Sequence, residues 1–104
     1  MKAEVVHIAE CANWEEAGHR LRIALDTLGA HDVAVDYRLL TSGEDAATVW
    51  FAGSPTILID GADAFPTGGR ISELACRVFY TEQGLSRLPT VEQMVDAVRA
   101  RQPR

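Results

Sequence analysis

Apolar and polar residues follow different periods along the first part of the chain. A short, β-branched apolar run over Glu4–Ala9 predicts a buried strand. Apolar residues then recur at helical spacing, which predicts an amphipathic helix with Gly29 as its natural C-cap. The apolar stripe of that helix consists of Trp14, Ala17, Leu21, Ala24, Leu25 and Leu28.

The middle of the chain predicts two more strands with a short helix between them. Val33–Leu40 is the second strand, and Thr41–Glu44 has the spacing of a capping box. The helix that this box opens is expected to extend to about Phe51. Thr56–Ile59 is the third strand, and Asp60–Gly61 is a tight-turn signal directly after it.

The last third of the chain predicts a loop, a strand and a helix. Pro66–Arg70 is a Gly-rich loop, and Ala75–Thr81 alternates weakly, as a fourth strand would. Thr90–Gln93 is a second capping box, which opens a helix whose apolar face contains Val91, Met94, Val95 and Val98. The predicted order is therefore βαβαββα. We expect one domain over residues 1–104, with a four-stranded mixed sheet in the order 2-1-3-4 and helices on both faces.

Composition excludes several function classes. The 104 residues are 47% hydrophobic and carry a net charge of −5, so binding to a phosphate backbone is not expected. No segment approaches the roughly 20 apolar residues of a membrane span, and the N-terminus lacks the pattern of a signal peptide. We therefore expect a cytoplasmic protein without nucleic-acid or membrane partners, in which two cysteines indicate thiol chemistry or burial more than a permanent bridge.

Cys11 is the first candidate for chemistry. It follows the first predicted strand and precedes the first predicted helix, and sites in open α/β sheets lie at the carboxyl ends of parallel strands. A helix N-terminus favours thiolate over thiol, so we expect a partly exposed, moderately activated nucleophile. The alternative is a small buried hydrophobic residue. Asn13 is expected to cap the helix or bind near the thiolate, and Trp14 to cover the site or pack in the core.

A second group of candidates lies at the start of the third strand. In Gly53-Ser54-Pro55-Thr56, the proline occupies a position where a strand tolerates it. A cis bond at Pro55, facing Cys11, would leave the backbone of Ser54 free to pair with an extended peptide or a small thiol. We therefore take Ser54, Pro55 and Thr56 as candidate substrate-binding residues, together with Asn13 and Trp14.

Cys76 is the second candidate catalytic residue. If Ala75–Thr81 is antiparallel to the third strand, Cys76 lies at the end away from Pro55, and this geometry opposes a pair with Cys11. A pair becomes possible if the strand begins later and residues 70–76 fold back over the site.

No metal is expected, because His7, His19 and His31 have no metal-ligand spacing and two thiols do not complete a zinc site. Asp60 and Asp63 flank the tight turn and are assigned to it.

A strand, a Cys-x-x-x helix start and a later Gly-Ser-Pro-Thr before a strand together resemble the thioredoxin superfamily. The resemblance is carried by residues 4–60 and by the last helix. It implies a three-layer α/β/α fold, a cis bond at Pro55 and a reactive thiol at Cys11. Trp14 occupies the place of the family's resolving thiol, so dithiol exchange within that motif is not available.

Four further segments resemble a group of small actinobacterial thioredoxin-like proteins labelled as related to alkylmercury (organomercurial) lyase. These segments are residues 11–13, 51–56, 59–65 and 74–80. The lyase uses two thiols and an Asp, and Cys76–Tyr80 resembles the strand that carries its second thiol.

Several functions therefore remain open. The first is a thiol redox protein whose partner is a small thiol or a protein disulfide, and which needs no cofactor. The others are a non-catalytic binding module, a lyase-like soft-metal protein that uses Cys11 and Cys76, and a structural dimer subunit. The sequence does not decide between enzyme and non-enzyme, or give the oligomeric state.

Overall fold

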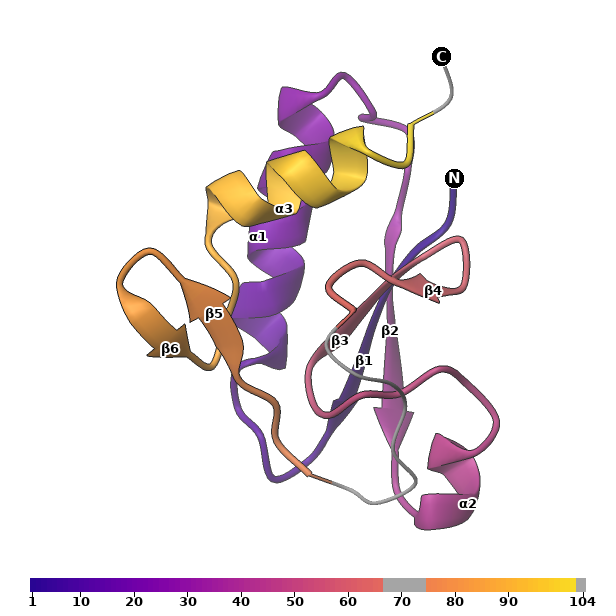
Figure 1. The fold of residues 1–104 in the computed structure, drawn as a ribbon. Helices are drawn as coiled ribbons and strands as arrows, with labels where there is room; N and C mark the ends of the chain where they lie inside the picture. Colours follow the sequence, from indigo (N-terminus) through magenta and orange to yellow (C-terminus); the bar gives the residue numbers. More distant parts are fainter. Residues whose placement is uncertain (67–74, 103–104) are drawn as a thin grey trace.

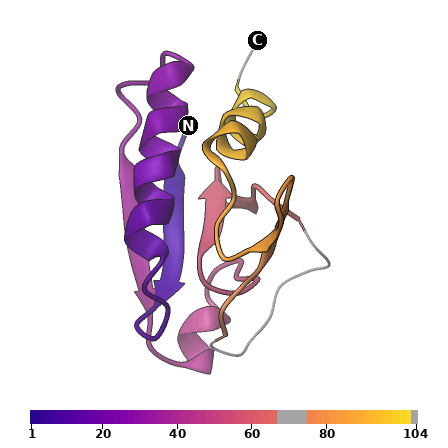
Figure 2. The same cartoon turned by 90° about the vertical axis from the view of Figure 1, so that its left-hand side faces the viewer.

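The fold is a four-stranded mixed sheet with helices packed against it (Figure 1). The computed structural model describes residues 1–66 and 75–102. Its elements are β1 (Ala3–Ile8), α1 (Trp14–Thr27), β2 (Val35–Leu40), α2 (Gly43–Ala46), β3 (Thr56–Ile59), β4 (Ala62–Asp63), β5 (Phe79–Thr81), β6 (Gly84–Ser86) and α3 (Val91–Arg99). β1 pairs in parallel with β2 and antiparallel with β3, and the sheet order is β2-β1-β3-β4 (Figure 2).

Alternating side chains of the central strands divide the core into two clusters. Val5 and Ile57 point to one face of the sheet, where they join the apolar stripe of α1 and the buried side of α3. Val6 and Leu58 point to the other face, where they pack with Leu40, Ala46, Phe51 and Cys11. The helix stripe that the sequence predicts is confirmed, because Ala17, Leu21, Ala24 and Leu25 are all buried. The capping box at Thr90 and Gln93 is also present as predicted.

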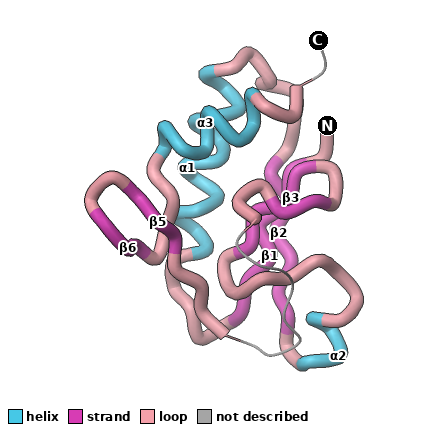
Figure 3. The backbone as a smooth tube through the Cα atoms, viewed as in Figure 1, coloured by secondary structure: helices cyan, strands magenta, loops and turns pink. Residues whose placement is uncertain are grey.

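The predicted fourth strand is wrong. After the turn at Asp60 and Gly61, both with positive φ, the chain returns for only two residues as β4, and this short strand takes the fourth place in the sheet. The segment expected to be that strand, Ala75–Thr81, instead divides into an isolated bridge at Cys76 and strand β5. β5 forms a separate hairpin with β6, which stands apart from the main sheet (Figure 3).

The second helix is also shorter than expected. It begins after Ser42, whose hydroxyl accepts from the Asp45 N–H at 3.1 Å, and it ends at Ala46 instead of near Phe51. The Thr48 hydroxyl donates to the Asp45 carbonyl at 2.7 Å and so satisfies one of the acceptors that the helix end exposes.

None of the helices within residues 1–66 and 75–102 is long and apolar enough to cross a membrane.

Candidate functional site

The two cysteines of the chain form a disulfide. Cys11 and Cys76 are separated by 65 positions in sequence and have their Cα atoms 6.2 Å apart. This distance lies within the ordinary range for a disulfide. The expectation that strand geometry keeps the two thiols apart is therefore wrong. The later strand start, considered as the alternative, is what occurs, because β5 begins only at Phe79.

Backbone pairing at Ser54 brings Cys76 to the site. The Ser54 N–H donates to the Ala75 carbonyl at 2.7 Å, and the Arg77 N–H donates to the Ser54 carbonyl at 2.9 Å. These two bonds form a parallel bridge between Ser54 and Cys76. The sequence predicted that the backbone of Ser54 is free to pair with an added peptide. This prediction is wrong. A segment of the same chain already occupies that backbone.

The side chains around this bridge hold the loop before β3 in place. The Ser54 hydroxyl accepts from the Ile8 N–H at 3.0 Å, which ties the loop to the end of β1. The Thr56 hydroxyl donates to the Gly53 carbonyl at 2.6 Å and accepts from the Ala52 N–H at 3.0 Å. The Ser54–Pro55 peptide bond is cis, as the resemblance implies.

Three of the expected substrate-binding residues are therefore inside the protein. Ser54, Pro55 and Thr56 are all buried, and both hydroxyls already have protein partners. Of the three, Ser54 contacts the Cys76 segment through its backbone, and the Thr56 hydroxyl bonds within the loop before β3.

Arg77 anchors the segment that carries Cys76. Its side chain is buried and forms an ion pair of 3.0 Å with the equally buried Asp63 of β4. The guanidinium also donates to the Phe65 carbonyl and lies 4.7 Å from the centre of the Phe79 ring. From the sequence, Asp63 was expected to belong to the turn, and Arg77 was not among the candidate site residues. The available signal was the alternation after Cys76, which places an arginine at an inward position where burial requires an acidic partner.

The two sulfur-bearing residues differ in exposure. Cys11 is only 3% exposed and belongs to the second core cluster, whereas Cys76 is exposed. The expectation of a partly exposed Cys11 is therefore wrong, because the loop and α2 cover that side of the sheet. Asn13 is the N-cap residue of α1, but its side chain makes no capping hydrogen bond.

Trp14 belongs to an aromatic stack beside α1. Its ring stacks on His7 with centroids 4.3 Å apart and meets the Tyr37 ring in a T-shaped contact with centroids 5.5 Å apart. His7 is buried, and its Nδ1 atom has no hydrogen-bond partner among the described residues. Burial lowers the pKa of the His7 imidazole below its ordinary value, and a weaker interaction with the Ile8 backbone acts in the opposite direction.

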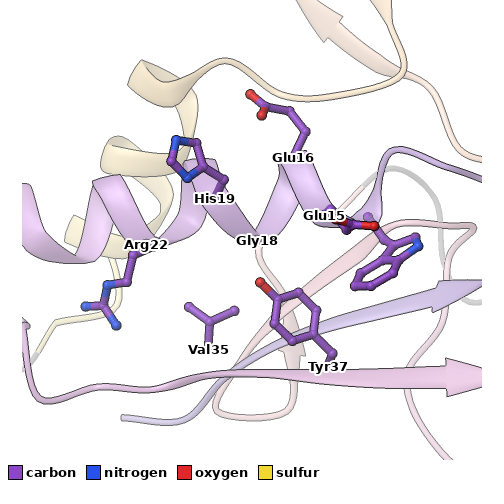
Figure 4. Close-up of a pocket in the computed structure, with 8 residues that line it drawn as sticks. Glu15, Glu16, Gly18, His19, Arg22, Val35 and Tyr37 are labelled. Atoms are coloured by element: carbon purple, nitrogen blue, oxygen red, sulfur yellow. The ribbon is translucent and has the colours of Figure 1, made fainter.

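A groove of about 700 Å³ extends from Trp14 along α1 and β2 (Figure 4). Tyr37 forms its floor, with the hydroxyl directed at α1 beside Gly18, and Glu15, His19 and Arg22 lie along the helix. The groove contains Trp14 but neither cysteine, so it is separate from the disulfide. Within the described parts of the chain, no three His, Cys, Asp or Glu side chains gather as a metal site would require.

Comparisons of the chain with protein-family models, with curated proteins and with solved structures found no match.

Proposed function

We propose that the protein exchanges disulfides with other thiols, using Cys11 and Cys76 as its redox pair. The observation that carries this proposal is the asymmetry of the disulfide, which joins an exposed cysteine to a buried one. In the proposed exchange an attacking thiolate reaches the sulfur of Cys76, and Cys11 then becomes the leaving thiolate. This assignment reverses the roles expected from sequence, where Cys11 was the nucleophile.

The exchange proceeds in two balanced steps. A thiolate of a dithiol partner attacks the Cys76 sulfur, the bond to Cys11 breaks, and Cys11 takes the electron pair as a thiolate. The second thiolate of the partner then attacks the partner's first sulfur, which is bonded to Cys76 in the mixed disulfide. The bond to Cys76 breaks, and Cys76 leaves as a thiolate. The partner leaves as a disulfide, and the protein holds two thiols. The same steps in reverse, with a disulfide partner, restore the Cys11–Cys76 bond.

The surface around Cys76 favours a protein partner over a small thiol. From Cys76 to Tyr80 the chain alternates, so that Cys76, Val78 and Tyr80 are exposed while Arg77 and Phe79 are buried. Tyr80 is 75% exposed, and Leu85, its cross-strand neighbour on β6, is 64% exposed. An apolar stripe thus begins at the disulfide. Such a stripe would bury apolar surface against a partner polypeptide during the exchange.

The first experiment compares the two cysteines separately. In Cys11→Ser the remaining thiol is exposed, and in Cys76→Ser it is buried. We expect Cys11→Ser to form a mixed disulfide with Ellman's reagent at least tenfold faster than Cys76→Ser, measured by stopped-flow absorbance at neutral pH. Equal rates, or a faster reaction of Cys76→Ser, would contradict the assigned roles. If glutathione cannot reduce the disulfide in the folded wild-type protein, the disulfide is a structural crosslink and not a redox pair.

The second experiment tests the partner class. We expect Tyr80→Ser together with Leu85→Ser to slow oxidation of a reduced protein, such as reduced ribonuclease A, by several-fold. The rate with dithiothreitol should stay unchanged, because a small thiol does not use the apolar stripe. Tyr37→Ser is the control, since it removes a tyrosine that is 49% exposed on another surface. If both rates fall together, the stripe acts through the fold and the partner is not a protein.

The alternatives make different demands on the same residues. A non-catalytic binding module would not need either thiol, so Cys11→Ser with Cys76→Ser would leave its binding unchanged. A lyase-like soft-metal protein would use the reduced pair, and two adjacent thiols suit a two-coordinate soft ion. Titration of the reduced protein with Hg(II), followed by thiolate-to-metal absorbance, separates that function from disulfide exchange alone.

A further inference from the structure

The outer edge of β2 has no strand partner in the described structure. β2 is the first strand in the order β2-β1-β3-β4, so one of its edges pairs with β1 and the other faces outward (Figure 2). All six of its residues are in register with β1, and the strand is not shortened by a bulge. An open edge of this length presents backbone donors and acceptors to another strand.

One face of β2 is apolar although it is exposed to water. Tyr37 is 49% exposed and Leu39 is 50% exposed, and both lie on the same face of the strand. The strand contains neither a proline nor a lysine, which are common means of blocking an edge.

The other face of β2 has a charge pattern that is complementary to itself. Asp36 has no ion-pair partner among the described residues, and its neighbour in register on β1 is another acid, Glu4. Arg38 lies two positions further along the same face, 3.4 Å from the Glu4 carboxylate. The face therefore has one acid in need of a cation and one arginine that is 44% exposed at its side chain.

We propose that β2 pairs antiparallel with β2 of a second copy of this chain, about a two-fold axis at Tyr37. Tyr37 then faces the partner's Tyr37, and Val35 faces the partner's Leu39. Asp36 faces the partner's Arg38, and by symmetry this ion pair forms twice. Directly opposite residues of antiparallel strands lie on the same face, so charges and apolar groups both meet their complements.

The charges select this register among the symmetric ones. A shift by two residues in one direction places Asp36 opposite the partner's Asp36. A shift by two in the other direction places Arg38 opposite the partner's Arg38. Like charges directly opposite each other destabilise a strand pair. A second copy is thus the occupant that fits, because one strand supplies both halves of each ion pair in a single register.

Charge reversal tests the proposal. We expect wild type to be a dimer by sedimentation equilibrium, and Asp36→Arg to weaken self-association by at least tenfold, because it replaces both ion pairs with like-charge pairs. Asp36→Arg combined with Arg38→Asp restores opposite charges and should recover the dimer. Glu82→Arg, in the turn of the β5–β6 hairpin, is the matched control and should leave the dimer unchanged. Circular dichroism confirms that each variant folds.

Crosslinking tests the register. In the proposed dimer a cysteine at position 37 lies opposite its own copy, within the Cα separation that a disulfide spans. Tyr37→Cys should therefore give a covalent dimer on oxidation, located by peptide mass mapping to position 37. Leu39→Cys should not, because the two copies of that position are separated by four strand residues, roughly 13 Å. A monomeric wild type, or equal crosslinking by both variants, would overturn the proposal.

Discussion

The face of the sheet under α1 and α3 and the corner at the disulfide are held together in different ways. The helix face is an apolar cluster in which residues from β1, β3 and two helices bury hydrocarbon against one another. The disulfide corner depends on a few specific links: one covalent bond, the Ser54 bridge and the ion pair of Arg77 with Asp63. The first kind of packing adds many small contributions. The second concentrates stability in single groups. Single substitutions should therefore have different effects on stability and on disulfide reduction in the two regions.

The disulfide should give the largest effect. Under the chain-entropy model, a crosslink between residues 65 positions apart stabilises the folded state by about 4 kcal/mol. We expect Cys76→Ser to lower the free energy of unfolding by roughly that amount, measured by urea denaturation of the oxidised proteins. Reduced wild type is the control and should match the variant. Equal stability of oxidised and reduced wild type would show that the corner does not depend on the bond.

Removing the acid of the buried ion pair should come next. Asp63→Asn leaves the Arg77 charge buried without its counter-ion, and we expect a loss of about 3 kcal/mol. It should also raise the rate at which dithiothreitol reduces the disulfide, because Arg77 holds the segment that presents Cys76. Leu21→Ala is a matched variant on the helix face, expected to cost about the same. If Leu21→Ala accelerates reduction equally, the two regions are not separate.

A substitution at Gly53 tests how closely the loop before β3 approaches the segment that contains Arg77. Its φ is +108°, and a Cβ there would lie 2.8 Å from the Arg77 Cβ and 3.2 Å from its Cα. We expect Gly53→Ala to destabilise the protein by about 2 kcal/mol in thermal or urea melts. Gly84→Ala has a similar φ of +101° but nothing within 4 Å of the added methyl, so it isolates the backbone contribution. Equal losses for the two variants would exclude a role for the contact with Arg77.

The smallest effect belongs to His7, whose ring stacks on Trp14 of α1. Because burial lowers the pKa of His7 in the folded state, the unfolded chain binds more protons below its ordinary pKa of about 6.5. Stability should therefore fall as pH decreases below that value, with a slope of at most about 1.4 kcal/mol per pH unit. His7→Phe keeps a ring against Trp14 and should flatten the profile between pH 7.5 and 5.5. An unchanged profile would assign the dependence to other groups.

The same contrast explains what the sequence could predict. The stripe of α1, the buried runs of β1 and β3 and the capping box at Thr90 and Gln93 depend on neighbours within a few residues, so local periodicity was sufficient. The position of Cys76 depends on Ser54 and Asp63, which are distant in sequence, and on a two-residue strand too short to have a pattern. Cys11 was placed correctly along the chain, but its burial depends on residues of α2 and of the loop before β3.

The disulfide also divides the chain into a ring and two tails. The ring runs from Cys11 to Cys76 and contains α1, β2, α2, β3 and β4, whereas β1 precedes it and the β5–β6 hairpin and α3 follow it. A protease that cuts once inside the ring leaves both fragments linked until a reductant is added. A single cut beyond Cys76, in the hairpin, leaves α3 attached by noncovalent contacts, which include its packing on α1 and the Arg20–Pro89 hydrogen bond. Limited proteolysis with and without reductant would therefore read the redox state of the protein directly from its fragment masses.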